Sequence, residues 1–293
     1  MSKNTKKLGL GAKASRRLTN TAVYIILIAI MVIWLFPFFG ILMESFRIEG
    51  TGQKSYIIPQ VFGFDNYKYL IYGENGNSFM KWFFNTASVG VITAFIQTFF
   101  IISMSYALSR LRFKMRKPLM NFMLILGMFP GFLTLILIYK VFADFGLIES
   151  NASLGLIIVY CASSGMGYYV SKGFFDTIPR SLDEAARVDG ATRFQVLYKV
   201  ILPLSKPIVI YTILMGFMAP WGDFMMANYI IHENSEGMNV AVGMFEWLSR
   251  TNVNTHYTTF CAAGVMVAVP VTLVFLLLQK YYVEGVTGGA VKG

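Results

Sequence analysis

Six long apolar runs, separated by shorter polar segments, dominate the pattern of hydrophobic and polar positions along the chain. Each run approaches or exceeds the roughly 20 apolar residues that a helix needs to cross the hydrocarbon core of a bilayer. The pattern therefore predicts an all-α integral membrane protein with six transmembrane helices. The expected spans cover residues 22–43, 82–109, 118–139, 152–171, 208–231 and 257–278.

The first apolar run follows a basic and polar N-terminal segment, residues 1–21. The run is longer than the apolar core of a secretory signal peptide, and no small-x-small cleavage pattern follows it, so we interpret it as an uncleaved anchor. The chain then continues as a transmembrane domain over residues 22–280 and ends in a glycine-rich tail, residues 281–293. Between the first two spans we expect a loop with a short interfacial helix near residues 64–70.

Composition and charge agree with a membrane protein. The chain is 56% hydrophobic and 14% charged, whereas a soluble domain has about 45–50% apolar and about 25% charged residues. Nineteen of the 25 lysines and arginines lie in the segments on the same side as the N-terminus, and six lie on the other side. Such a bias marks the cytoplasmic side. We therefore expect both termini in the cytoplasm and contacts with membrane lipid, and we attribute the net charge of +10 to topology rather than to nucleic-acid binding.

The longest polar segment with a helical pattern, residues 178–207, lies between the fourth and fifth expected spans, on the cytoplasmic side. The pairs Ser181–Glu184 and Thr192–Gln195 have the spacing of capping boxes. Gly190 suits a left-handed helix end, and Pro203 is expected to end the second helix. The segment contains no His, no Cys and no metal-ligand spacing. It predicts a helix–turn–helix that docks to a partner rather than an active site.

One ionisable residue, Asp223, lies inside the expected spans. Ionisable residues within a bilayer are costly and usually functional. Pro220 and Gly222 loosen the helix at this point, so Trp221, Asp223 and Asn228 are candidates to line a polar passage for a sugar. The alternative is structural: Asp223 caps a broken helix or bonds a neighbouring helix.

The sequence contains no catalytic constellation, no metal-ligand cluster and no nucleotide-binding P-loop. Cys161 and Cys261 lie in apolar segments, which indicates core residues, and His232 and His256 are isolated. We expect no catalytic residue, metal or cofactor in this chain. A membrane-embedded enzyme is disfavoured by these absences. A secondary sugar transporter that works alone is the alternative, although a coupled carrier would be expected to bury more than one acid.

Residues 184–190, with the sequence EAARVDG, and the Ile-Leu-Pro at 201–203 lie in a cytoplasmic loop before the last two expected spans. This arrangement resembles the EAA loop of ABC-importer permeases. Asn85-Thr86 at the head of the second span and the glycine-rich ending are similar to carbohydrate-uptake permeases of the MalG type. The runs 217–224 and 240–243 look most like the maltodextrin and oligosaccharide branch, with Gly222 as a departure from the wider family.

The resemblance implies a type I ABC-importer transmembrane domain that forms half of a translocation pathway in a bacterial plasma membrane. It also implies a second homologous, MalF-like permease, two copies of a cytoplasmic ABC ATPase that uses ATP and Mg²⁺, and an extracytoplasmic sugar-binding protein. The implied substrate is an oligosaccharide, with malto-oligosaccharides first and galactan-, arabinan- or alginate-type oligosaccharides behind them.

The resemblance assigns coupling to the cytoplasmic loop, whose helix sits in a cleft of the ATPase and moves with it. The acid of the motif would anchor the helix, its alanines would allow close approach, and the glycine would permit the turn. Each of these residues also has a structural interpretation, as a cap, a helix former or a helix end. The residues implied for coupling are Glu184, Ala185, Ala186, Asp189, Gly190, Leu202 and Pro203, and the C-terminal residues implied to reach the ATPase are Gly288, Gly289 and Lys292.

Overall fold

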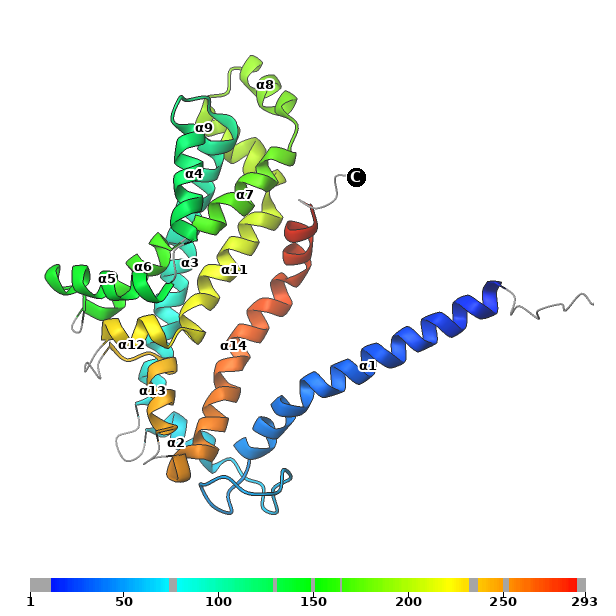
Figure 1. Ribbon diagram of the computed structural model, residues 1–293, viewed down its shortest axis with the longest axis vertical. Coiled ribbons are helices and arrows are strands. Elements are labelled where there is room, and N and C mark those ends of the chain that lie inside the picture. The colour runs from blue at the N-terminus through cyan, green and yellow to red at the C-terminus, as the bar shows by residue number, and fades with distance from the viewer. Residues whose placement is uncertain are drawn as a thin grey trace, which may run out of the picture.

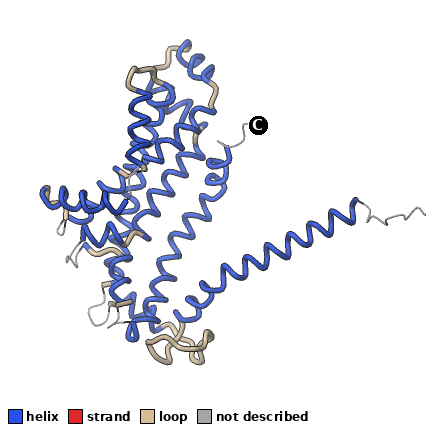
Figure 2. Tube along the Cα trace, in the orientation of Figure 1, coloured by secondary structure: helices blue, strands red, loops and turns tan. Residues whose placement is uncertain are grey.

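The computed structural model describes residues 12–73, 78–128, 131–148, 151–163, 165–231, 237–249 and 253–288. These ranges are helical apart from loops, and no β-strand occurs in them, so the predicted all-α class is confirmed there (Figure 2). The elements are α1 (Ala12–Ser45), α2 (Asp65–Tyr72), α3 (Phe79–Arg110), α4 (Arg116–Gly127), α5 (Gly131–Asp144), α6 (Ala152–Ala162), α7 (Gly165–Thr177), α8 (Arg180–Val188), α9 (Arg193–Val196), the π-helical turn η3 (Leu197–Ile201), α10 (Leu202–Leu204), α11 (Lys206–Gly222), α12 (Met225–Ile231), α13 (Val240–Trp247) and α14 (Val253–Gly288).

Three helical segments of the described chain are long and apolar enough to cross a membrane alone: Thr19–Ser45, Phe79–Arg110 and Asn254–Tyr281. Two bent pairs could each form one further span, namely α6 with α7, bent by 44°, and Arg193–Leu204 with α11, bent by 84°. The expected third span is divided between α4 and α5. The chain is therefore a multi-pass membrane protein, while the count of six spans and the orientation of the termini stay predictions.

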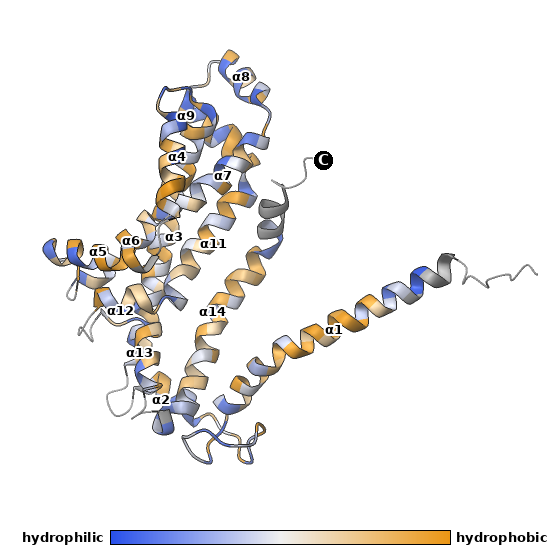
Figure 3. Ribbon diagram, in the orientation of Figure 1, coloured by the Kyte–Doolittle hydropathy of each residue, from blue (hydrophilic) through white to orange (hydrophobic). Residues whose placement is uncertain are grey.

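Helix α1 diverges from the rest of the molecule and approaches it only near its C-terminal end, beside the start of α14 (Figure 1). None of its most apolar stretch is buried against the chain. The exposed surface of this helix is apolar over most of its length (Figure 3). A membrane, or a second protein within the membrane, is the environment that such a surface requires.

Helices α3 and α11 pack closely along the centre of the molecule, and two glycines allow this approach. A Cβ atom on Gly90 would lie 2.9 Å from the carbonyl oxygen of Phe217, and one on Gly216 would lie 2.9 Å from the Cα of Ala94. Small residues at such points let two backbones come together where lipid supplies no hydrophobic drive. The pair α3–α11 is therefore the axis around which α6, α7 and α14 are arranged.

Two apolar clusters flank this axis. The larger one surrounds Trp82, Trp221 and Trp247, and includes buried residues of α6, α12 and α13. The second cluster joins the end of α3 to the polar segment between α7 and α11, and therefore positions that segment on the membrane domain. Its buried members are Ile102, Tyr106, Phe175, Ile178, Val196, Ile201 and Ile208.

The loop between α1 and α3 is organised by Arg47, whose side chain is fully buried. Its guanidinium forms ion pairs with Glu44 and Glu49, each at 2.7 Å, and donates a hydrogen bond to the carbonyl of Tyr56 at 2.7 Å. A buried guanidinium requires this degree of pairing. Helix α2 confirms the short helix expected near residues 64–70.

Candidate functional site

The polar segment forms two short helices, α8 and α9, joined by a tight turn at Gly190. This glycine has φ of +84°, and the amide of Ala191 donates to the carbonyl of Ala186 at 2.9 Å, the bond of a Schellman helix end. The next helix begins with a complete capping box. The Thr192 amide donates to Gln195 Oε1 at 2.7 Å, and the Gln195 amide donates to Thr192 Oγ1 at 3.2 Å. The turn and the second capping box are confirmed.

Two predictions for this segment are wrong. The Ser181–Glu184 capping box does not form, because α8 begins at Arg180, two residues earlier than predicted, with Pro179 as its N-cap and no side-chain cap bond. Ser181 is thus already inside the first turn. Pro203 does not end the helix either. It lies in α10, directly after the π-helical turn η3, and the helix ends at Leu204. A proline is tolerated in the first turn of a helical segment, where its missing N–H has no partner to lose.

Three side chains at the end of α3 bond to the α8–α9 pair and to the end of α7. Arg110 forms an ion pair with Asp183 at 3.2 Å and donates to the carbonyl of Ile178 at 2.9 Å. Tyr106 donates its hydroxyl hydrogen bond to the carbonyl of Arg193 at 3.0 Å. Ser109 donates to Asp176, at the end of α7, at 2.6 Å. Helices α7, α8 and α9 are therefore all bonded to the end of α3.

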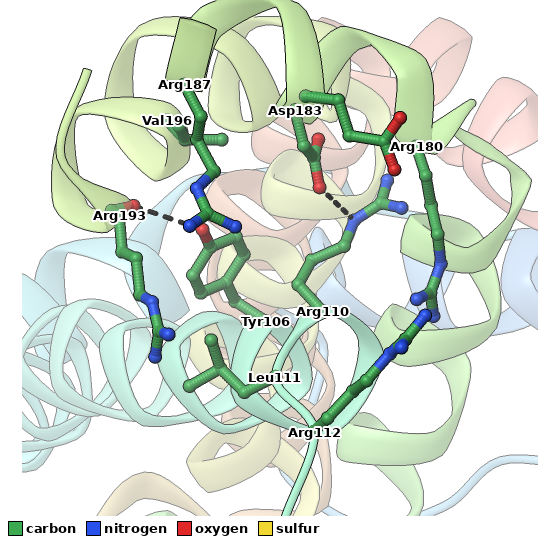
Figure 4. A pocket seen from close by; sticks show the side chains of 10 residues that line it. Tyr106, Arg110, Leu111, Arg112, Arg180, Asp183, Arg187, Arg193 and Val196 are labelled. Atoms are coloured by element: carbon green, nitrogen blue, oxygen red, sulfur yellow. Dashed lines mark hydrogen bonds and ion pairs between the residues drawn. The ribbon is translucent and has the colours of Figure 1, made fainter. Parts of the chain in front are cut away.

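Beneath α8 lies a cavity of about 400 Å³ that is lined mainly by arginines (Figure 4). Burial raises the pKa of Asp183, and the positive charges of Arg110 and Arg180 offset this effect in part. The side chains of Arg112, Arg187 and Arg193 have no hydrogen bond or ion pair within the described residues. The lining residues are Tyr106, Arg110, Leu111, Arg112, Arg180, Asp183, Glu184, Arg187, Arg193 and Val196.

The α8–α9 pair also carries three exposed large apolar side chains. Leu182 is 41% exposed, Val188 88% and Phe194 71%. They lie at a polar end of the molecule (Figure 3), where such exposure of apolar side chains calls for an explanation. We call Leu182, Val188 and Phe194 the docking face.

The predicted coupling residues differ in their exposure and contacts. Glu184 is exposed at the rim of the cavity, whereas Ala185 and Asp189 are exposed to solvent. Ala186 and Leu202 pack against the second apolar cluster of this chain. The small size of Ala186 therefore serves contacts within the chain, and Ala185 is the alanine of the motif that a partner can reach.

The remaining predicted residues lie at the helix ends. Pro203 is exposed on α10, and Gly288 is the last residue of α14. The C-terminal end of α14 points toward the same end of the molecule as α8 (Figure 1). Gly289 and Lys292 lie outside the described residues. Sequence reasoning missed the contribution of Arg110, because the basic run to which it belongs was attributed to topology alone.

The candidate substrate residues lie around the break between α11 and α12. Trp221 is 7% exposed, with its ring centroid 5.2 Å from that of Phe83. Asp223 accepts a hydrogen bond from the amide of Met226 at 3.1 Å and another from the hydroxyl of Tyr160 at 2.9 Å. Asp223 therefore caps the start of α12 and bonds α6, which confirms its structural interpretation.

Of the three candidate path residues, Asn228 has the most exposed side chain and Trp221 the least. Among the described residues, no group of three or more His, Cys, Asp or Glu side chains could hold a metal ion.

Comparison with known proteins agrees with this architecture. The family model described as "Binding-protein-dependent transport system inner membrane component" matches residues 102–288. The chain is 33% identical to the galactooligosaccharides transport system permease protein GanQ of Bacillus subtilis, covering 92% of this chain and 94% of that protein. It is 32% identical to the maltodextrin transport system permease protein MalD of Streptococcus pneumoniae, covering 96% and 98%.

The fold is also similar to that of a crystal structure of a bacterial ABC transporter involved in the import of the polysaccharide alginate. The TM-score is 0.75 at 24% identity, with 92% of this chain and 98% of that chain covered. The match of the family model covers more than half of the chain. The chain therefore belongs to the family of binding-protein-dependent transport system inner membrane components.

Proposed function

We propose that this chain is the permease subunit of an ATP-driven importer of oligosaccharides in a bacterial plasma membrane, and that α8 is its coupling helix. The single observation that supports this most is the docking face, an exposed apolar surface on a helix pair that is bonded to α3. A cytoplasmic ATPase is the partner proposed for this face. ATP and Mg²⁺ would be used by that partner, since the sequence contains no P-loop.

The proposed mechanism is mechanical. Closure of the ATPase would move α8, and the ion pair between Arg110 and Asp183 and the bond from Tyr106 to α9 would move the end of α3 with it. Because α3 and α11 are packed through Gly90 and Gly216, the two helices would shift together. This would alternate the access of the pathway between the two sides of the membrane.

The test replaces the exposed apolar side chains of the docking face by acids. Val188→Asp with Phe194→Asp should abolish copurification of the ATPase and transport, because the docking face would then bury charge. Ile58→Asp is the matched control, since Ile58 is 63% exposed on the loop between α1 and α3, away from α8. Copurification of the ATPase with the double variant at the wild-type level would refute the assignment of this face.

A second, homologous permease is proposed to cover α1 within the membrane. The support is the apolar surface of α1, which is unburied against its own chain. Under an added oxidant, a disulfide between a single cysteine on α1, for instance Ile26→Cys or Ile33→Cys, and a single cysteine introduced into a membrane helix of the second permease should yield a heterodimer. Cross-linking that yields homodimers of this chain alone would contradict the proposal.

The proposed substrate class is a short oligosaccharide of the malto- or galacto- type. The support is the similarity to proteins named for galactooligosaccharide and maltodextrin transport. The extracytoplasmic binding protein of the system should bind malto- or galacto-oligosaccharides more tightly than the arabinan- and alginate-type oligosaccharides of a panel. Uptake that depends on this chain should follow the same order, and Asn228→Ala is the first variant to test for contact with the sugar.

The alternative of a secondary transporter that works alone is tested by deleting the ATPase gene. The proposed importer requires that uptake is lost with the ATPase. Uptake that persists, and that follows an ion gradient instead, would favour the alternative.

A further inference from the structure

A strongly basic surface continues from the arginine-lined cavity onto the segment that joins α3 to α4. Arg112 lines the cavity and also lines a second hollow of about 610 Å³. None of the residues that line the second hollow is acidic. They are Arg112, Phe113, Lys114, Arg116, Lys117 and Pro118.

The charges in the cavity are not balanced by the chain itself. Five arginines line it together with two acids, Asp183 and Glu184. Arg110 and Arg180 have partners, since Arg110 pairs with Asp183 and Arg180 donates to the carbonyl of Ser109 at 3.0 Å. The other three arginines have no hydrogen bond or ion pair among the described residues. A guanidinium does not lose its proton in proteins, so the cavity lining keeps a net positive charge that favours an anion.

The position of the cavity indicates where such an anion comes from. Arg110 is both a cavity residue and the last residue of α3, so the cavity adjoins the polar end of a helix that is long and apolar enough to cross a membrane. Next to it, Phe113 is 41% exposed and Met115 is 64% exposed among the basic residues. Apolar side chains interleaved with cations are typical of a segment at the boundary between acyl chains and anionic headgroups.

We propose that the cavity binds the phosphate group of an anionic phospholipid, and that Arg112, Arg187 and Arg193 supply the positive charge of its lining. The fork of a guanidinium matches two oxygens of a phosphate group, which favours arginine over lysine at such a site. Phe113 and Met115 lie at the acyl boundary beside the headgroup. The bound lipid connects α8 to the α3–α4 segment, which makes anionic lipid a structural component of the site. This proposal does not depend on the identity of the transported substrate.

The experiment uses the purified transporter complex that contains the full chain. Short-chain phosphatidylglycerol, short-chain phosphatidylcholine and inorganic phosphate are titrated separately, and binding is followed by native mass spectrometry. The test variants are the pair Arg112→Gln with Arg187→Gln, and Arg193→Gln alone; all three side chains are exposed, so folding should be retained. The matched control is Lys199→Gln, which removes an exposed cation of the same cytoplasmic segment that lines neither hollow.

The wild-type complex and the control should bind phosphatidylglycerol in preference to phosphatidylcholine. The double variant should bind it at least about tenfold more weakly, because hydrogen bonds to charged groups contribute about 1.5–3 kcal/mol each. Unchanged binding in the double variant, or an equal loss in the control, would overturn the proposal. Binding of inorganic phosphate without phosphatidylglycerol would overturn the lipid as the source of the phosphate. Loss of the ATPase with lipid binding unchanged would show that the arginines receive acidic protein side chains instead.

Discussion

Gly190 offers a test of the coupling helix in which the perturbation is confined to backbone conformation. It has φ of +84°, and a Cβ atom built on it would meet no atom within 4 Å. A substitution therefore introduces no clash, and its cost is that of placing an L-residue in the left-handed region, about 1–2 kcal/mol. Part of this is offset by about 0.4–1 kcal/mol when glycine is replaced, because the unfolded chain becomes less flexible.

The net cost of Gly190→Ala is then about 1 kcal/mol, which corresponds to a several-fold smaller population of the native turn. Gly190→Val should cost more, because a β-branched residue rarely adopts positive φ, and Gly190→Asn should cost least. Transport and substrate-stimulated ATP hydrolysis in proteoliposomes should fall in the order Asn, Ala, Val, while the amount inserted in the membrane stays constant.

The matched control is Gly173→Ala. Gly173 lies inside α7, and a Cβ atom there also meets nothing within 4 Å, but no positive φ is involved. This variant should keep its activity. Equal losses for Asn, Ala and Val at position 190 would show that the added side chain, rather than the backbone, is responsible. Wild-type transport by Gly190→Val would refute the requirement for this turn.

Three further predictions concern the rest of the chain. Asp223→Ala should lower the free energy of unfolding in detergent by about 1–3 kcal/mol, because it leaves the hydroxyl of Tyr160 without its acceptor. The loss of stability in the double variant Asp223→Ala with Tyr160→Phe should be smaller than the sum of the losses in the two single variants. Burial tends to raise the pKa of Glu49, but hydrogen bonds from two backbone amides and the charge of an arginine lower it below its ordinary 4.5. The contribution of Glu49 to stability is therefore present above pH 4.5 and is lost as the pH falls through the lowered pKa. The rate of amide hydrogen exchange in this loop should therefore rise when the wild-type protein is acidified. In the Glu49→Gln variant the exchange rate should not show this rise. Gly243→Ala should destabilise the protein by about 1–3 kcal/mol, because the new Cβ would overlap a tryptophan ring on α3; Gly264→Ala, whose nearest contact is an ordinary 3.9 Å, should show no such loss in the same thermal melt.

The local features of the coupling segment were predictable because their hydrogen bonds span few residues. The turn at Gly190 and the box formed by Thr192 and Gln195 need only backbone and side chains within five positions. The start of α8 was misplaced by two residues, because long-range contacts determine it. Ile178 is buried in the second apolar cluster, and its carbonyl accepts a hydrogen bond from Arg110. These contacts fix the position of the residues between the end of α7 and the start of α8.

The arginine-lined cavity could not be predicted, since its members come from segments about 70 residues or more apart in the chain. Arg110 and Arg112 follow α3, whereas Arg187 and Arg193 belong to α8 and α9. In the sequence each group is explained by the retention of basic residues on the cytoplasmic side, which leaves nothing to indicate that they converge.

The sequence by itself determined the membrane class, the position of the polar helix–turn–helix segment and the turn at Gly190, because apolar length, polarity and backbone preference are local properties. Only the tertiary structure decided which side of α8 is exposed, that Ala186 faces its own chain, and that Asp223 bonds Tyr160. These depend on how α3, α6 and α11 pack, and packing between helices depends on the shapes of side chains that are distant in sequence.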